Sequence, residues 1–280
     1  MTRATILIPA HNEAAVIGRT LWFLSRGLPQ NAFEVIVIAN GCTDATAARA
    51  RAATPQAKVI ETDRAGKCHA LNLGYADSVK GGPVIFMDAD LDVTSDSIKA
   101  LIGPLTTGTA LAACGQMDVV TTHASPLVKS FYRGWRTNPY FNRGKFGGLF
   151  ALSAVTAARL LPLPEITADD EFIRRSIPAP DIALAEGCTF TACAPANLFD
   201  LIKVRRRSIR GARQVGKMGL SRPDPSSLAG MFRQAMTKPS EIIPVLVFLT
   251  IMTWVRIALA FEGDAAKTRW ERDLSSRAVG

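Results

Sequence analysis

Four short apolar runs alternate with alanine-rich stretches in the first hundred residues, and this alternation most constrains the fold. The apolar runs, rich in β-branched residues, cover 5–8, 35–38, 58–62 and 84–87, and the stretches between them cover 14–25, 44–53 and 68–78. Strands that alternate with helices build βαβ units, which form a parallel sheet. We therefore predict an α/β fold, continued by a helix over 95–105 with Ser95 as its N-cap and by a strand over 110–120.

A polar turn follows each of the four predicted strands. The turns are Pro9-Ala10-His11-Asn12-Glu13, Ala39-Asn40-Gly41-Cys42-Thr43-Asp44, Asp63-Arg64-Ala65-Gly66-Lys67 and Asp88-Ala89-Asp90. Parallel strands share their carboxyl ends, so all four turns are expected at one edge of the sheet, where open α/β sheets bind ligands. Four polar turns that meet in one crevice predict a site of nucleotide size.

Asp88 and Asp90 come directly after the apolar run Val84–Met87. In an extended backbone residues i and i+2 face the same side, so both carboxylates are expected to point into one crevice. Paired hard oxygens suit Mg²⁺ or Mn²⁺ held together with substrate phosphates. A solvated turn after a strand is the alternative explanation for this tripeptide.

Composition narrows the class of protein. The chain has 280 residues, of which 48% are hydrophobic, enough for one large α/β domain or two small ones. Its five cysteines lack the spacing of a disulfide framework or a zinc site, which favours reduced thiols in the cytosol. The first apolar run is too short for a signal peptide, so we expect the catalytic body not to be exported.

The net charge of +9 is unevenly distributed, with seven Lys and Arg between 203 and 217. Such a cluster favours phosphates, carried by a nucleic acid, an anionic membrane or a nucleotide diphosphate; a solvated helix face is the other interpretation. No recognised nucleic-acid module accompanies the cluster, so nucleic-acid binding is disfavoured.

Two other segments leave alternatives open. The twenty residues Ile242–Phe261 are interrupted by the single charge of Arg256 and match one bilayer crossing in length. They predict a membrane-spanning or interfacial helix, with a buried or partner-binding helix as the alternative. The aromatic and basic stretch 131–146 fits core packing or an acceptor-binding surface. Residues 221–227, with Pro223 and Pro225, predict a loop or linker.

Further motifs complete an ordered series. They are Gly66-Lys67 followed by Ala70-Leu71-Asn72-Leu73-Gly74, then Gly147-Gly148, then Asp169-Asp170-Glu171, and finally Val204-Arg205-Arg206-Arg207-Ser208-Ile209-Arg210-Gly211. Together with the turns above, from about Thr5 to Gly211, they resemble family-2 glycosyltransferases, inverting enzymes that use nucleotide-diphosphate sugars. The resemblance implies a GT-A (Rossmann-like) mixed, mainly parallel sheet flanked by helices, here with a C-terminal apolar helix.

The resemblance also implies roles for individual residues. Asp90 coordinates a divalent metal, Mn²⁺ or Mg²⁺, Asp88 contacts ribose or metal-bound water, and Asp170 is the catalytic base, preceded by the motif's other acid, Asp169. The implied nucleotide and donor contacts are Pro9, Ala10, Glu13, Asn40, Lys67, Asp88, Gly147, Gly148, Asp169, Arg206, Arg207 and Arg210. A cluster of three acids also favours one raised pKa through like-charge repulsion, which suits a base working near neutral pH.

The sequence departs from the family pattern in two places. Ala39 and Asn40 replace two acids, which removes carboxylates that often contact the base; the Asn40 amide retains the ability to hydrogen-bond a base edge. Val204 and Ser208 replace the glutamine and tryptophan of polysaccharide synthases, which argues against a processive enzyme.

We therefore predict a non-processive inverting glycosyltransferase of polysaccharide or glycolipid assembly, at the cytoplasmic face of the cell membrane. The expected partners are a nucleotide-diphosphate sugar, with UDP-sugars favoured, a lipid-linked or saccharide acceptor, and the membrane through the C-terminal helix. Alternatives are a sugar nucleotidyltransferase, although the Gly-rich first loop of that class is missing after Ile8, and a non-catalytic, membrane-attached nucleotide-sugar-binding subunit.

The predicted domain organisation has four segments. A catalytic domain covers 1–220, with a nucleotide-binding half at 1–92 and an acceptor and base half at 93–220. A linker at 221–240, an apolar membrane-associated helix at 241–262 and a polar tail at 263–280 follow.

Overall fold

The computed structural model describes residues 3–29, 31–138, 146–220 and 228–261. Its strands are β1 Ala4–Ala10, β2 Phe33–Asn40, β3 Lys58–Thr62, β4 Val84–Met87, β5 Asp92–Val93, β6 Ala112–Val120, β7 Leu149–Leu152 and β8 Ile182–Cys193. Its α-helices are α1 Ile17–Ser25, α2 Thr46–Ala53, α3 Lys67–Ala76, α4 Ser95–Thr106, α5 Pro126–Arg136, α6 Ala154–Leu160, α7 Asp169–Arg175, α8 Leu198–Lys217, α9 Leu228–Thr237 and α10 Ile242–Ala260.

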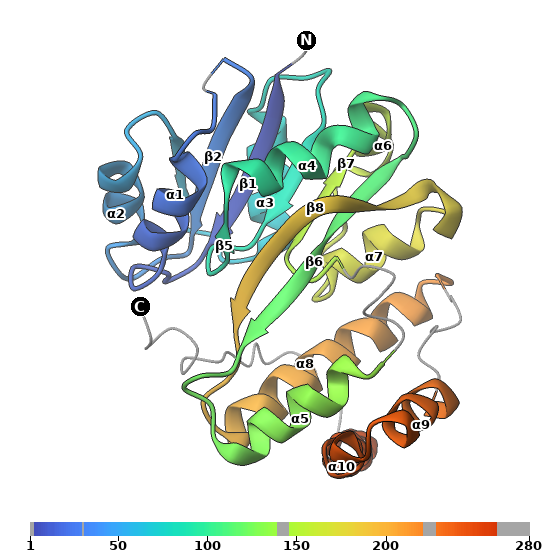
Figure 1. The fold of residues 1–280 in the computed structure, drawn as a ribbon. Coiled ribbons are helices and arrows are strands. Elements are labelled where there is room, and N and C mark those ends of the chain that lie inside the picture. The colour runs from blue at the N-terminus through green and yellow to red at the C-terminus, as the bar shows by residue number, and fades with distance from the viewer. Residues whose placement is uncertain (1–2, 30, 139–145, 221–227, 262–280) are drawn as a thin grey trace. The chain divides into compact units, whose positions relative to one another are not determined.

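The strands form an eight-stranded sheet in the order β3-β2-β1-β4-β7-β6-β8-β5 (Figure 1). Within it β1 pairs in parallel with β2 and β4, and β2 in parallel with β3. β7 pairs antiparallel with β4 and β6, and β5 antiparallel with β8. The predicted βαβ units are thus confirmed for the first four strands, and the remaining strands make the sheet mixed.

Period-two alternation along the strands separates two hydrophobic layers. Ile6 and Ile8 of β1 face one layer, which also receives apolar residues of α1, α2 and α4. Leu7 faces the other layer, which receives residues of α3, α6 and α7. Both faces of β1, β2 and β4 are therefore covered, which explains the apolar runs in their sequences, whereas the edge strand β3 is partly exposed and carries Lys58 and Glu61.

The predicted N-cap of α4 is wrong by one residue, although the helix begins at Ser95 as predicted. Thr94 is the N-cap of α4: its backbone is extended and its hydroxyl accepts a hydrogen bond from the backbone N–H of Ser97. Ser95 is the first helical residue instead. Both residue types are good caps, and Thr94 takes the role because its side chain reaches the N–H three residues on.

The chain divides into two compact units. The first contains 1–118 and 144–192, and the second contains 119–143 and 193–279. This division by contacts differs from the predicted domain boundaries, because α5 and α8 group with the C-terminal helices rather than with the sheet. Residues 221–227 of the predicted linker and the polar tail at 263–280 lie outside the described residues, as do Tyr140 and Phe141 of the aromatic stretch. Residues 228–237 of the predicted linker form the helix α9 instead.

The second unit is built around contacts between α5 and α10. Phe131, Tyr132 and Trp135 of α5 are buried, so the described part of the aromatic stretch serves core packing. Phe131 packs on Phe248 of α10 with ring centroids 5.2 Å apart. At Gly134 the two helices come so close that a Cβ would lie 2.1 Å from the backbone oxygen of Pro244.

We predict that Gly134→Ala lowers the free energy of unfolding by about 1–3 kcal/mol, because the added methyl group meets backbone that cannot move aside alone. Gly18→Ala in α1 is the matched control: its Cβ meets nothing within 4 Å, and it is expected to change stability by about 1 kcal/mol at most. Urea unfolding followed by tryptophan fluorescence measures both. Equal stability of the two variants would show that α5 and α10 do not pack this closely.

Candidate functional site

The polar turns after β1, β2 and β3 end at one edge of the sheet, as predicted. Ala10 pairs with Ala39, and Asn40 with Thr62, so these three strands end level with one another. Pro9 and Ala10 are the last two residues of β1, and the Asn40 side chain lies beneath this edge at 3% exposure.

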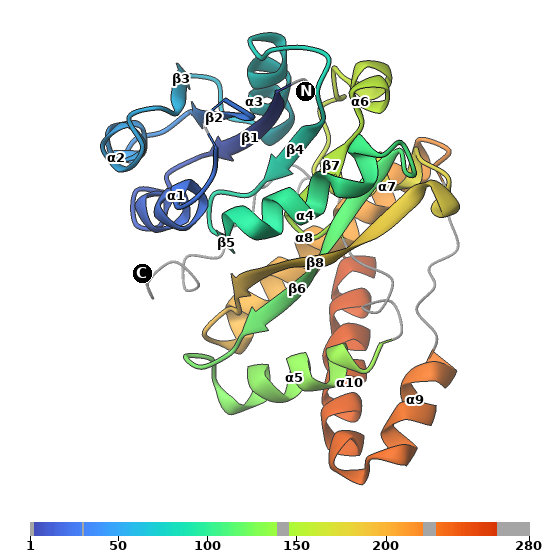
Figure 2. The same ribbon diagram turned by 45° about the horizontal axis from the view of Figure 1, so that its top comes forward.

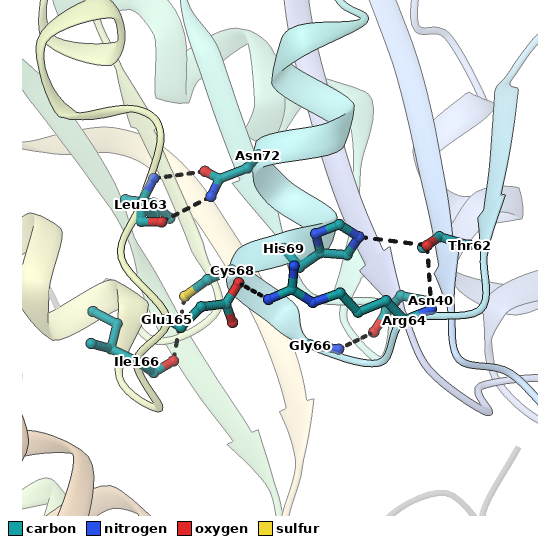
Figure 3. A network of polar contacts seen from close by, with 10 residues as sticks. All are labelled: Asn40, Thr62, Arg64, Gly66, Cys68, His69, Asn72, Leu163, Glu165 and Ile166. Carbon is teal, nitrogen blue, oxygen red and sulfur yellow. Dashed lines mark hydrogen bonds and ion pairs between the residues drawn. The ribbon is translucent and has the colours of Figure 1, made fainter.

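Hydrogen bonds to the backbone occupy the side-chain amide of Asn40. Its Nδ2 donates to the carbonyl oxygens of Ala10 and Ile38, at 2.9 and 3.3 Å. Its Oδ1 accepts from the N–H of Gly66 at 3.0 Å, which ties the turn before α3 to the end of β2 (Figure 3). This arrangement gives Asn40 a structural role, and a contact between its amide and a base stays a prediction.

The turn after β1 is held by the turn after β2. Asn12 adopts a positive φ of 52°, and its Oδ1 accepts from the backbone N–H of Thr43 at 2.7 Å. The N–H of Glu13 donates to Thr46 Oγ1 at 2.8 Å, and the Glu13 side chain is buried. Asp44 accepts from the N–H groups of Ala14 and Thr46, so it joins the two turns as well as serving the start of α2.

Asp88 and Gly148 come from different strands and meet at the same edge. The N–H of Asp88 donates to the carbonyl oxygen of Gly148 at 2.8 Å. Gly148 has a φ of +97°, and a Cβ there would lie 2.7 Å from Asp88 Oδ2. Only glycine fits this position, both because of its backbone conformation and because the carboxylate fills the space a side chain would need.

Lys67 connects two acids that are far apart in the sequence. Its Nζ lies 2.8 Å from Asp88 Oδ1 and 3.1 Å from Asp169 Oδ2. Burial alone would lower the pKa of Lys67, but the carboxylates of Asp169 and Asp88 outweigh it and hold the pKa above its usual range. The ammonium therefore stays charged at neutral pH. The predicted helical stretch 68–78 corresponds to α3, which begins at Lys67; the contact of Lys67 with a diphosphate stays a prediction.

The three consecutive acids at the start of α7 have different environments. The Asp169 side chain is 4% exposed, and burial raises its pKa to about 6, against the attraction of Lys67. Glu171 is tied to Arg174 and Arg175, at 2.8 and 2.7 Å. Asp170 is half-buried, and its Oδ1 accepts from the N–H of Glu171. The raised pKa expected within this trio thus belongs to Asp169, mainly through desolvation.

Asp90 is half-buried, two residues beyond Asp88. The next acid, Asp92, is paired with Arg19 at 2.9 Å. No group of three His, Cys, Asp or Glu side chains suited to a metal occurs in the described residues. Two carboxylates that leave the remaining positions to substrate phosphates and water are nevertheless a donor set that fits Mg²⁺ or Mn²⁺.

Comparisons with known proteins show the family to which the chain belongs. The family model described as glycosyl transferase family 2 matches residues 5–156, more than half of the chain. The chain belongs to glycosyl transferase family 2. Among curated proteins, glycosyltransferase AglD of Haloferax volcanii is 31% identical over 119 residues, which cover 40% of this chain and 19% of AglD. The match thus spans about a fifth of that relative's length.

Solved structures share the fold of this family-2 glycosyltransferase. Mannosyltransferase PcManGT from Pyrobaculum calidifontis, in complex with GDP-Man and Mn²⁺, has a TM-score of 0.61 at 21% identity, covering 99% of this chain and 78% of that one. Glucosyl-3-phosphoglycerate synthase from Mycobacterium tuberculosis, in complex with Mn²⁺, UDP and glucosyl-3-phosphoglycerate, has a TM-score of 0.54 at 19% identity, covering 80% and 81%. The predicted GT-A fold is confirmed.

In this glycosyltransferase, hydrogen bonds hold the segment that precedes α7 against α3. The Asn72 side chain binds both polar backbone groups of Leu163: its Nδ2 donates to the carbonyl oxygen at 2.8 Å, and its Oδ1 accepts from the N–H at 2.6 Å (Figure 3). Asn72 thereby fixes a backbone segment ninety-one residues further along the chain. Asn72 belongs to one of the motifs that resemble the family, but the spacing of the residues in that motif does not indicate that Leu163 is its partner.

Two more contacts complete this attachment. Cys68 Sγ donates to the carbonyl oxygen of Ile166 at 3.3 Å, and Arg64 forms an exposed ion pair with Glu165 at 3.0 Å (Figure 3). Burial raises the pKa of the Cys68 thiol to about 12, so it remains a protonated donor. Lys67 and Asn72 both belong to α3. Through Lys67 this helix contacts the Asp169 side chain, and through Asn72 it holds the backbone of the segment that precedes α7.

The predicted donor ligands Arg206, Arg207 and Arg210 lie on α8 of the second unit, where all three are half-buried. Gly147 and Gly148 directly precede β7 in the first unit. The roles of these five residues toward a donor stay predictions.

We predict that Asn72→Leu lowers the free energy of unfolding by about 1–3 kcal/mol, because it removes both hydrogen bonds to the Leu163 backbone. Arg64→Met is the matched control, since it removes an exposed contact with the same segment and is expected to cost less than about 1 kcal/mol. Urea unfolding of the two variants measures the difference. Limited proteolysis within 161–168 should also be faster for Asn72→Leu; an equal effect of both variants would contradict the attachment through Asn72.

Proposed function

We propose that the protein is an inverting glycosyltransferase that moves a sugar from a nucleotide-diphosphate sugar to an acceptor hydroxyl. The observation that carries this proposal is the pairing of acids in α7. Asp169 is buried against Lys67, whereas its neighbour Asp170 is half-buried at the same helix start. Asp169 thus stabilises the site, and Asp170 has the exposure that proton transfer with a substrate requires.

Asp170 accepts the proton of the acceptor hydroxyl as the oxygen attacks the anomeric carbon. The bond between that carbon and the diphosphate oxygen breaks on the opposite face, so configuration inverts and the nucleotide diphosphate leaves. A single base suffices for this displacement. A divalent metal held through Asp90 and Asp88 would, when bound, offset negative charge on the diphosphate. Lys67 adds a fixed positive charge beside Asp88, which supports the same role.

The donor and acceptor are proposed from chemistry and from the relatives. PcManGT was solved with GDP-Man, and glucosyl-3-phosphoglycerate synthase with UDP-Glc. We assign a UDP-sugar to this chain as the first donor to test. A lipid-linked or saccharide acceptor, and a non-processive role in polysaccharide or glycolipid assembly, agree with the apolar α10 and with Val204 and Ser208 in α8.

The proposed location is the cytoplasmic face of the cell membrane, with attachment through α10. The helical segment Pro239–Ala260 has 22 residues and a mean hydropathy of 2.2, so it is long and apolar enough to cross a membrane. A buried helix of a soluble protein meets the same criteria.

We predict that Asp170→Asn lowers kcat about 10²- to 10⁴-fold, because an amide cannot accept the hydroxyl proton. Donor binding, measured by calorimetry, should change little. Asp96→Asn is the control, since Asp96 is an exposed acid at the start of α4. Full activity of Asp170→Asn would contradict its role as base, and donor binding without transfer by the unsubstituted protein would indicate a non-catalytic binding subunit.

We predict that Asp90→Asn abolishes Mn²⁺-dependent stabilisation by a nucleoside diphosphate, because it removes one of two carboxylate ligands. The readout is the rise in Tm when UDP and Mn²⁺ are added together, compared with UDP and EDTA. Asp92→Asn serves as control, because Asp92 is paired with Arg19. EDTA should also stop turnover. Undiminished metal-free activity, or an unchanged rise in Tm for Asp90→Asn, would rule out this metal site.

A further inference from the structure

One side of α10 exposes large apolar side chains. Ile243, Leu246, Trp254 and Ile257 are each between 51% and 71% exposed, and Phe261, directly after the helix, is 86% exposed. They follow one another at intervals of three to eight residues, close to whole helical turns, so they lie along one side of the helix. Met236 of the neighbouring α9 is 80% exposed. Exposed apolar surface of this kind indicates a binding surface.

The opposite side of α10 is buried along its whole length. Its buried residues are Pro244, Val245, Phe248, Ile251, Val255 and Leu259. The helices that contact α10 are α5, α8 and α9, all of the second unit (Figure 2). At its start, Glu241 also forms an ion pair with Arg133 of α5 at 2.9 Å. The helix is thus part of the second unit from its first turn to its last.

Charge separates the two units sharply. The described residues of the second unit include 13 Lys and Arg against 2 Asp and Glu, a net charge of +11. Those of the first unit include 13 Lys and Arg against 17 Asp and Glu, a net charge of −4. The unit with the exposed apolar helix therefore carries the whole positive excess. A net positive charge in the unit that carries the exposed apolar helix is complementary to anionic lipid head groups over acyl chains.

The packing of α10 also argues against a membrane crossing. If α10 crossed the bilayer, the helices packed along it would enter the hydrocarbon too. Lys129, Arg133 and Arg136 of α5 are exposed, and charged side chains are expensive in hydrocarbon. At the membrane surface, by contrast, Arg256 and Lys238 remain exposed to phosphate groups while the apolar side chains enter the acyl region.

We propose that the second unit docks on an anionic lipid bilayer, with α10 lying in the interface along its exposed apolar side and not crossing the membrane. The inference deepens the membrane attachment included in the proposed function. It names both the partner, an anionic bilayer surface, and the surface that binds it, the exposed side of α10 with Met236 of α9.

The first experiment measures binding of the full chain to vesicles of phosphatidylcholine alone or with 30% phosphatidylglycerol, by flotation. Binding should require the anionic lipid and should weaken in 0.5 M KCl. Leu246→Glu should reduce binding about tenfold or more, since it places a charge in the acyl region. Val155→Glu, a similar change at an exposed residue of α6 in the first unit, is the control and should bind normally. Circular dichroism checks that both variants fold.

The second experiment distinguishes a helix in the interface from one that crosses. Three variants each keep a single tryptophan, at position 243, 250 or 254, with every other tryptophan (Trp22, Trp135, Trp270 and, in the first two variants, Trp254) replaced by phenylalanine. Quenching of that tryptophan by lipids brominated at shallow or deep acyl positions is compared. A helix in the interface gives strongest quenching by the shallow bromines at all three positions. Deep quenching at position 250 with shallow quenching at 243 would show a crossing helix and overturn the inference.

The outcomes are separable from those of the proposed function. Stabilisation by UDP and Mn²⁺ should be the same for Leu246→Glu and the unsubstituted protein, because Leu246 on α10 is neither one of the acids of the first unit nor one of the predicted donor ligands on α8. Failure to bind anionic vesicles together with normal nucleotide binding would overturn the docking inference alone. The lipid-free protein could instead form a dimer that Leu246→Glu abolishes, while the unsubstituted protein fails to bind vesicles. That result would assign the surface to a second copy of the chain and would also overturn the docking inference.

Discussion

The ion pairs of Lys67 with Asp88 and Asp169 are the interaction on which the site depends. They join the start of α3, the end of β4 and the start of α7, three segments separated by about twenty and eighty residues along the chain. Asp169 is buried, so its negative charge would be costly without the ammonium beside it. The ammonium in turn is held charged by the two carboxylates. Neither helix could present its charged first residue toward this edge without the other.

Backbone contacts supply the accuracy that these charges need. The side chains of Asn40 and Asn72 each hydrogen-bond backbone groups of distant segments. Each therefore supports the site without having to contact a substrate. Gly148 allows Asp88 to approach the backbone of the neighbouring strand. The acids proposed to act on metal and acceptor therefore sit on elements whose positions are fixed by hydrogen bonds, which is how a site keeps its geometry before a substrate arrives.

The two units differ in the physical character of their surfaces. The first is slightly acidic and carries the carboxylates of the candidate site; the second is strongly basic and exposes an apolar helix. A glycosyltransferase that acts on an acceptor in or near a membrane benefits from such a division, because attachment and chemistry then depend on different residues.

The sequence by itself determined the βαβ half of the fold and the order of the motifs, because apolar periodicity and strand-end turns are local properties of the chain. The same local patterns located Asp88 and Asp90 as candidates, and the resemblance to family-2 glycosyltransferases added Asp170. Only the tertiary structure decided that Lys67 bridges Asp88 and Asp169, that Asn72 binds Leu163, and that Asn40 uses its amide on the backbone. It also decided that one side of α10 is buried in the second unit, which its nearly uniform apolar sequence conceals. These features depend on which distant segments pack together, and no local pattern records the partner of a contact.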